Sequence, residues 1–362
     1  MRTKRVVLAG FYPPPFAGEP VHVKQLAQFL RDRGLRVEIL NLNRQACPSP
    51  DYHSSTQRWA LLWKLFTLGD QASIIHLHTN GHSLKSWLMI LTAGLAARLR
   101  GVSAVLTLHS GLFPAYVRGF GKLRRGLARW ILRSFKRVVC VNGDICRTVQ
   151  GLGITGACAV TIPAFLGVPV PPELAPPDRE LIRNLRPLLV TVAGGEQDPE
   201  LGLAVVLHAV QQLVPSMPGV MAVLMGWQVG PKTRPLIQEL GLGAHAICLG
   251  EVSHDRCLAF LHAADVLVRS TFADGDAITV REGLAFGVPV VASDTDYRPE
   301  GVILFRKGDV ADLVAKLTQV LTAPGAGSRS PRPFRVQPAT DLWEVYSELG
   351  SSTLPVAPAT SN

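Results

Sequence analysis

Paired cysteines are missing from this sequence of 362 residues. Its six cysteines form no C-x-x-C pair, and most lie inside apolar runs; they are Cys47, Cys140, Cys146, Cys158, Cys248 and Cys257. We therefore expect reduced thiols in the core rather than a disulfide framework. His76 and His78 alternate in the run IIHLH, but no acidic or cysteine residue lies near them in the sequence. No metal site is expected there, because zinc sites combine several such ligands.

Long apolar runs are missing as well. A membrane-spanning helix needs about 18 or more consecutive apolar residues. The longest candidate, residues 86–97, lies between Lys85 and Arg98 and is typical of a buried helix. The N-terminal residues MRTKRVVLAG contain too short an apolar segment for a secretory signal. These features predict a cytoplasmic protein with no membrane span.

Acidic residues are scarce in the first half of the chain. Residues 1–165 hold 22 basic and 6 acidic residues, whereas the remainder holds 15 and 21. No acidic residue lies between Asp70 and Asp144, a stretch with eleven basic residues. This asymmetry favours a surface for an anionic lipid, an anionic substrate or a nucleic acid on the first half alone.

Short β-branched runs alternate with amphipathic stretches in both halves of the chain. Strands are predicted at 6–10, 37–42, 74–78, 104–109, 137–141, 188–194, 220–226, 264–270 and 288–293. Helices are predicted at about 21–33, 84–99, 118–135, 200–214, 232–240, 279–286 and 309–322. Apolar strands that alternate with helices are typical of parallel sheets covered on both faces. The pattern predicts an α/β fold with two Rossmann-like domains.

The domain boundaries follow changes in composition. Seven prolines between Pro163 and Pro187 indicate a linker without a clear period, so we expect an N-terminal domain at 1–165, a linker at 166–187 and a second domain at 188–322. Residues 323–339 are expected to be flexible, residues 340–350 to form a helix that docks on the N-terminal domain, and residues 351–362 to be disordered.

The segment from Arg269 to Ser293 carries the strongest functional signal. Asp274 lies in a predicted loop, and seven residues separate it from Glu282, in the first turns of a helix. The free N–H groups of such a helix start suit an anionic diphosphate, and two carboxylates can accept hydroxyl protons from a sugar and a ribose. The pattern also fits an ordinary helix start, capped by Asp274 or Asp276 with a solvated Glu282.

The segment resembles the donor site of retaining, family-4-like glycosyltransferases with the GT-B fold. In that family an acid, seven residues, a Glu and a Gly-x-Pro-Val-Val-Ala-Ser strand occur in this order, and Glu282 and residues 287–293 match while Asp274 replaces the usual Glu. The resemblance extends over about residues 5–322. It implies two domains that face each other across a cleft and a nucleotide diphosphate sugar as donor, with no further cofactor.

Two N-terminal segments are similar to the same family. Phe11 to Val23 resembles the entry loop, in which Gly18 matches and would let the backbone approach a diphosphate; a plain strand-to-helix turn explains Gly18 equally well. His109 ends a predicted strand where the family carries a sugar-contacting histidine, although a lone histidine can also be a satisfied core group. The resemblance implies catalytic roles for His109 and Asp274 and donor binding by Gly18, Arg269, Gly275, Arg281 and Glu282.

One departure from the family concerns positive charge. The family usually places an Arg and a Lys in the loop after the first strand of the second domain, whereas residues 193–202 read AGGEQDPELG. We expect Arg269 and Arg281 to replace them, although both could be ordinary salt-bridge partners.

A basic stripe is predicted on the helix at about 118–135. Six residues recur at spacings of three and four; they are Arg118, Lys122, Arg125, Arg129, Arg133 and Lys136. With the apolar side in the core, the stripe could bind the anionic cytoplasmic face of a membrane or remain a solvated face. Nucleic acid is disfavoured, because no aromatic residues interleave with the basic ones.

Together these observations predict a glycosyltransferase that moves a sugar, with retention, from a nucleotide diphosphate sugar to an unidentified glycan, lipid-linked glycan or small molecule. The alternative is a non-catalytic binding or scaffold subunit with the same fold.

Overall fold

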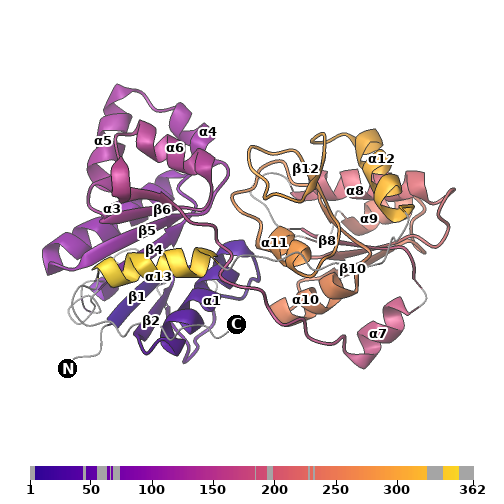
Figure 1. Ribbon diagram of the computed structural model, residues 1–362, viewed down its shortest axis with the longest axis horizontal. Coiled ribbons are helices and arrows are strands. Elements are labelled where there is room, and N and C mark those ends of the chain that lie inside the picture. Colours follow the sequence, from indigo (N-terminus) through magenta and orange to yellow (C-terminus); the bar gives the residue numbers. More distant parts are fainter. Residues whose placement is uncertain are drawn as a thin grey trace. The chain divides into compact units, whose positions relative to one another are not determined.

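The computed structural model describes residues 5–43, 46–54, 63–65, 67, 74–183, 185–193, 199–226, 229–230, 233–323 and 337–349. The tail predicted at 351–362, most of the segment predicted to be flexible and the loop residues Glu196 and Asp198 lie outside these ranges. The chain divides into two units (Figure 1). The first consists of residues 1–14, 19–167 and 336–362, and the second of residues 15–18 and 168–335.

The first unit contains a sheet of seven parallel strands. In spatial order they are β3 (His53–Ser54), β2 (Arg36–Asn41), β1 (Arg5–Gly10), β4 (Ile74–Thr79), β5 (Ser103–Leu108), β6 (Arg137–Cys140) and β7 (Ala159–Thr161). Among its helices are α1 (Gly18–Asp32), α3 (Leu84–Arg100), α4 (Phe113–Arg118), α5 (Lys122–Leu132), α6 (Gly143–Gly151) and the C-terminal α13 (Gln337–Leu349), with a short 3-10 helix at Gly156–Cys158.

The second unit contains a sheet of six parallel strands. Their order is β10 (Ala246–Gly250), β9 (Met221–Met225), β8 (Leu188–Val192), β11 (Val266–Arg269), β12 (Val290–Ser293) and β13 (Ile303–Phe305). The helices are α7 (Pro176–Ile182), α8 (Pro199–Leu213), α9 (Thr233–Glu239), α10 (His254–Ala263), α11 (Ile278–Ala285) and α12 (Val310–Leu321). Two Rossmann-like α/β sheets confirm the predicted fold class.

Alternation along the strands builds the cores. In β8, Leu189 packs into one apolar cluster, whereas Leu188 and Val190 pack into another. Successive side chains of a strand point to opposite faces, so both faces of the second sheet are covered. Each unit therefore has an apolar core of its own.

Helix α13, drawn in yellow in Figure 1, lies over the first sheet, and its apolar side chains complete the core of that unit. Leu342, Trp343, Val345 and Tyr346 pack with residues of β1, α1 and β2. The predicted docking of a C-terminal helix on the N-terminal domain is thus confirmed.

Two predicted segments differ from the structure. The helix expected at about 118–135 is two helices, because the chain breaks at Gly119 and Gly121, which end α4 and begin α5. The proline-rich stretch expected to be irregular contains α7, which Pro176 and Pro177 open. Proline is favoured in a first helical turn, where its missing N–H costs nothing. Among the described helices, none is both long and apolar enough to cross a membrane.

Candidate functional site

The middle of the second sheet is where its strand order reverses. Chain connections leave β8 and β11 in opposite directions, and ligands of open α/β sheets bind outside the carboxyl ends of such strands. A small cavity lies there, between the end of β8, the first turns of α8 and the end of β11. It is lined by Thr191, Val192, Ala193, Gly202, Leu203, Ser270 and Thr271.

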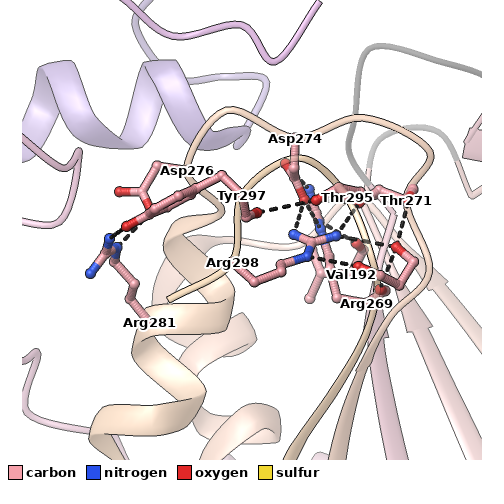
Figure 2. A network of polar contacts seen from close by, with 10 residues as sticks. Val192, Arg269, Thr271, Asp274, Asp276, Arg281, Thr295, Tyr297 and Arg298 are labelled. Atoms are coloured by element: carbon pink, nitrogen blue, oxygen red, sulfur yellow. Dashed lines mark hydrogen bonds and ion pairs between the residues drawn. The ribbon is translucent and has the colours of Figure 1, made fainter. Parts of the chain in front are cut away.

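Asp274 lies in the loop after β11, between two buried guanidinium groups (Figure 2). Its Oδ2 accepts hydrogen bonds from Arg269 Nε at 2.9 Å, Arg298 Nη1 at 2.7 Å and Thr271 Oγ1 at 2.9 Å. Its Oδ1 accepts one from Arg269 Nη2 at 3.0 Å. Burial alone would raise the pKa of Asp274, but Arg269 and Arg298 hold it well below its usual value.

This network occupies the carboxylate. An ionised carboxyl group offers about four acceptor positions, and four donors already meet Asp274. A sugar hydroxyl would therefore have to displace one of them. In this structure Asp274 anchors its loop to β11 and to the segment after β12, which carries Arg298.

Arg281 belongs to a second network nearby. Its Nε donates to Asp276 Oδ1 at 2.6 Å and its Nη2 donates to the hydroxyl of Tyr297 at 2.8 Å, with the Asp276 side chain fully buried (Figure 2). Arg281 and Arg269 are thus both paired with aspartates. The sequence predicts that both arginines neutralise a diphosphate. In the structure the charge of each arginine is already balanced by an aspartate.

Helix α11 starts without a capping side chain. Its N-cap is Ala277, from which no side-chain hydrogen bond reaches the first turn. The alternative expected from the sequence, a cap by Asp274 or Asp276, is therefore not what the structure has. Gly275 lies buried in the same loop. An uncapped helix start presents N–H groups and a positive dipole end to an anion.

Glu282 lies in α11 with its side chain fully buried. Its Oε1 lies 2.7 Å from Nε2 of His254, at the start of α10, whereas Oε2 is buried with no hydrogen-bond partner in the described part of the chain. Leaving a buried acceptor unsatisfied costs about 1–3 kcal/mol. A hydroxyl group of a bound molecule would satisfy this oxygen.

Four histidines gather in the first unit. His76 and His78 project from β4, His109 directly follows β5, and His22 belongs to α1. His78 Nδ1 lies 3.1 Å from His109 Nε2, and the rings of His22 and His109 lie 5.2 Å apart. This arrangement fixes the half-buried ring of His109 at the carboxyl end of β5.

The outer contacts of the cluster fix the other rings. His22 Nδ1 lies 2.6 Å from the carbonyl oxygen of Ala164, His76 Nδ1 lies 2.5 Å from the hydroxyl of Tyr346, and His76 Nε2 lies 2.7 Å from Thr107 Oγ1. Burial lowers the pKa of His22 to about 4 and that of His76 to about 3, so both are neutral at pH 7. Burial also places the pKa values of His78 and His109 well below the usual value.

The same cluster is the candidate metal site. Ligand nitrogens of His22, His78 and His109 lie within 4.8 Å of one another, and neutral imidazoles are zinc ligands by type. The short contacts between the rings also describe neutral imidazoles that hydrogen-bond to one another, so the donor set alone does not require a metal.

Gly18 is the exposed first residue of α1, and a Cβ added there would meet no atom within 4 Å. The backbone therefore does not need glycine to bend, but its open side leaves room for a ligand. Sequence reasoning missed the next residue. Burial raises the pKa of Glu19 to about 7, against a hydrogen bond that Phe11 N donates to its Oε1 at 3.3 Å.

The basic residues of the predicted stripe are all exposed, but they do not share one helix. Arg118 ends α4, Lys122, Arg125 and Arg129 lie on α5, and Arg133 and Lys136 follow α5. The expected burial of the apolar side is wrong for half of it. Ala128, Ile131 and Leu132 are buried, whereas Leu123, Leu127 and Trp130 are exposed.

Two family patterns match this chain. "Glycosyltransferase Family 4" matches residues 17–166, and "Glycosyl transferases group 1" matches residues 186–323. The chain belongs to the group 1, family-4-like glycosyltransferases. This glycosyltransferase is 25% identical over 324 residues to a phosphatidyl-myo-inositol mannosyltransferase of Mycobacterium leprae, an alignment that covers 82% of the chain and 79% of that protein.

Solved structures show the same GT-B fold. A sucrose-phosphate synthase from Thermosynechococcus elongatus has a TM-score of 0.70 at 18% identity, over 96% of the glycosyltransferase and 99% of that chain. Anabaena HepE in complex with UDP and glucose has a TM-score of 0.73 at 15% identity, over 95% and 100%. At these identities the likeness concerns the fold alone.

Proposed function

We propose that the glycosyltransferase takes its sugar from a nucleotide diphosphate sugar and transfers it, with retention, to an acceptor held by the first unit. The second unit binds the nucleotide at the carboxyl ends of β8 and β11. Relatives support the donor class, since HepE was solved with UDP and glucose.

The observation that carries the proposal is the buried Oε2 of Glu282, for which the described residues supply no hydrogen-bond partner. A ribose hydroxyl that donates to this oxygen would form a buried, charge-assisted hydrogen bond. His254 holds the other oxygen, so the carboxylate is already oriented before a ligand arrives.

The diphosphate is assigned to the N–H groups at the start of α11. Because Arg269 and Arg281 are paired with aspartates, the helix dipole and the backbone N–H groups contribute more to binding the diphosphate than the sequence suggested. Bond cleavage that builds negative charge on the leaving diphosphate is accelerated by such fixed dipoles. Asp274 supports this loop through its two arginines, and a direct contact with the transferred sugar requires one donor to move away.

His109 is assigned to the sugar on the acceptor side. The resemblance implies a contact between this histidine and a sugar, and the contact with His78 Nδ1 holds its ring in one orientation. A neutral imidazole can donate or accept one hydrogen bond at its remaining nitrogen, which suits a sugar hydroxyl.

The test measures nucleotide binding by calorimetry. A screen of UDP, GDP and ADP identifies the base, and the best ligand is then compared with its 2′,3′-dideoxy analogue. Wild type should prefer the ribonucleotide by about tenfold or more, since a hydrogen bond to a charged group contributes about 1.5–3 kcal/mol. Glu282→Gln should lose most of this preference.

Glu251→Gln, at an exposed carboxylate ahead of α10, is the matched control and should keep the preference. Equal binding of the two nucleotides by wild type would contradict the assignment of Glu282. Transfer with retention is checked separately, by the anomeric configuration of the product in NMR spectra.

The acceptor and the location are part of the same proposal. The mannosyltransferase relative acts, by its name, on phosphatidyl-myo-inositol, which favours a lipid-linked acceptor over a free small molecule. We assign the activity to the cytoplasmic face of a membrane, to which the protein binds reversibly.

A second candidate is a non-catalytic binding subunit with this fold. The pairing of Arg269 and Arg281 favours it, because arginines that are already balanced by aspartates stabilise a leaving diphosphate less well than free cations do. Nucleotide binding without any transfer or hydrolysis of the bound nucleotide sugar would support this candidate.

A further inference from the structure

Helix α5 exposes apolar side chains that a folded domain normally buries. Leu123 is 88% exposed, Leu127 55% and Trp130 49%. Spacings of four and three residues place them on one side of the helix. Only Ala128, Ile131 and Leu132 of this helix are buried, so the exposed apolar side has no partner in the described part of the unit.

Basic residues flank this apolar side. Lys122, Arg125 and Arg129 of α5, and Arg133 directly after its end, recur at spacings of three and four. Each is exposed, and none forms an ion pair with a described residue. The nearest acidic residue along the chain toward the C-terminus is Asp144, and none occurs between it and Asp70.

The neighbouring helix α3 also exposes apolar side chains. Helix α3 packs against α5 and exposes Leu84 at 70% and Leu88 at 44%, four residues apart. Trp87 contacts Phe120, just ahead of α5, with ring centroids 5.7 Å apart. Exposed leucines thus occur on two helices that are packed together.

We propose that α5 docks in the interface of an anionic lipid bilayer, with Leu123, Leu127 and Trp130 at the boundary of the acyl chains and the four basic residues at the headgroups. A helix with leucine and tryptophan on one side and lysine and arginine beside them fits such an interface. Opposite charge selects anionic headgroups.

Other occupants fit the surface less well. A second copy of the chain would bring the same basic residues face to face, and like charges repel. A nucleic acid would leave Leu123 and Leu127 in water while using only the basic side.

The sequence suggested attachment to the membrane by charge alone. The docking proposed here also inserts the exposed apolar side chains of α5 into the bilayer. Screening by salt removes most of the attraction between exposed charges, but it leaves the burial of apolar side chains intact. Binding to anionic vesicles should therefore fall but persist at 1 M salt. The inference does not depend on sugar transfer, since vesicle binding is measured without donor or acceptor.

The experiment uses the full chain and sedimentation with vesicles of phosphatidylglycerol and phosphatidylcholine, or of phosphatidylcholine alone. The triple variant L123Q/L127Q/W130Q should weaken binding to the anionic vesicles by about a hundredfold and abolish binding at high salt. The quadruple variant K122Q/R125Q/R129Q/R133Q should weaken it by about a thousandfold, at about 1 kcal/mol per charge.

Matched controls change the same residue types elsewhere. The control for the apolar changes is V170Q, at an exposed position of the second unit. The control for the charge changes is the quadruple variant R147Q/R179Q/R183Q/R306Q. Both variants should bind the vesicles as wild type does. A blue shift of tryptophan emission on mixing with anionic vesicles should be present in wild type and diminished in W130F.

Three outcomes would overturn the proposal. Wild type that stays in solution with both kinds of vesicle has no docking surface for lipid. A triple variant that binds as well as wild type shows attachment by charge alone. A wild type that forms dimers in solution, which the triple variant converts to monomers, shows that a second copy covers α5.

Discussion

At the scale of single residues, the pairing of Asp274 with two arginines predicts a structural cost for its loss. Asp274→Asn leaves Arg269 and Arg298 buried without their counter-charge, and breaking a buried pair in this way costs about 3–5 kcal/mol. The free energy of unfolding from urea denaturation should fall by this order.

Asp294→Asn, at an exposed carboxylate just after β12, should change the unfolding free energy by less than about 0.5 kcal/mol. If Asp274→Asn is equally mild but destroys binding of the nucleotide sugar, then the carboxylate serves the ligand rather than the loop.

The acidic residues of this site and Arg269 could be found from the sequence, whereas Arg298 and His254 could not. Asp274 and Glu282 stand in a spacing that the family shares. Arg298 and His254 lie 24 and 28 residues away from them along the chain, on other connections of the sheet. No local pattern encodes such a contact, because only the folded sheet brings the carboxyl ends of β10, β11 and β12 together.

At the scale of elements, long periodic segments were predictable and short or interrupted ones were not. The strands β3, β7 and β13 have only two or three residues, too few for any periodicity. The break between α4 and α5 falls on Gly119 and Gly121, while apolar residues continue at helical spacing across it. The helical spacing of apolar residues therefore predicted one helix, whereas Gly119 and Gly121 divide the segment into two helices.

Helix α13 packs in the core of the first unit, so its removal should destabilise that unit alone. A chain that ends at residue 336 lacks Leu342, Trp343, Val345 and Tyr346, which complete the core of the first unit. Hydrogen exchange should accelerate in β1 and β4 but stay slow in β8 and β11, which pack in other clusters.

Should the shortened chain aggregate, Tyr346→Ala in the full chain tests the same point. It removes a fully buried ring and the contact with His76, and should destabilise by about 3–5 kcal/mol. Faster exchange in both units to the same extent would contradict the separation of the cores.

At the scale of the whole molecule, the two units should respond to acid in different pH ranges. The pKa of His22 falls to about 4 and that of His76 to about 3 in the folded unit. As the pH falls, both histidines therefore bind protons in the unfolded chain before they do so in the folded unit. This stability is complete above pH 6.5 and is lost as the pH falls through 4, at up to about 1.4 kcal/mol per pH unit for each histidine.

One group of the first unit opposes this loss. The pKa of Glu19 is raised to about 7, so its contribution is complete below about pH 4.5 and is lost as the pH rises through 7. Two or more histidines outweigh this single carboxyl. In the second unit the lowered pKa of Asp274 gives stability that is lost only below about pH 4.

Hydrogen exchange at pH 7 and pH 5, corrected for the intrinsic rate, should therefore show a first unit that loses stability while the second does not. His76→Gln should flatten the pH dependence of the first unit. A parallel loss in both units would mean that other groups control the acid response.

The return of the chain to its first sheet also sets an order of events during synthesis. Residues 337–349 leave the ribosome after every strand of the second unit, yet they supply the ring that meets His76. The second unit can complete its core while the first still exposes the apolar side chains that α13 covers. A nascent chain therefore has a finished second sheet before its histidine cluster has all of its contacts, and the first domain to be translated is the last to complete its core.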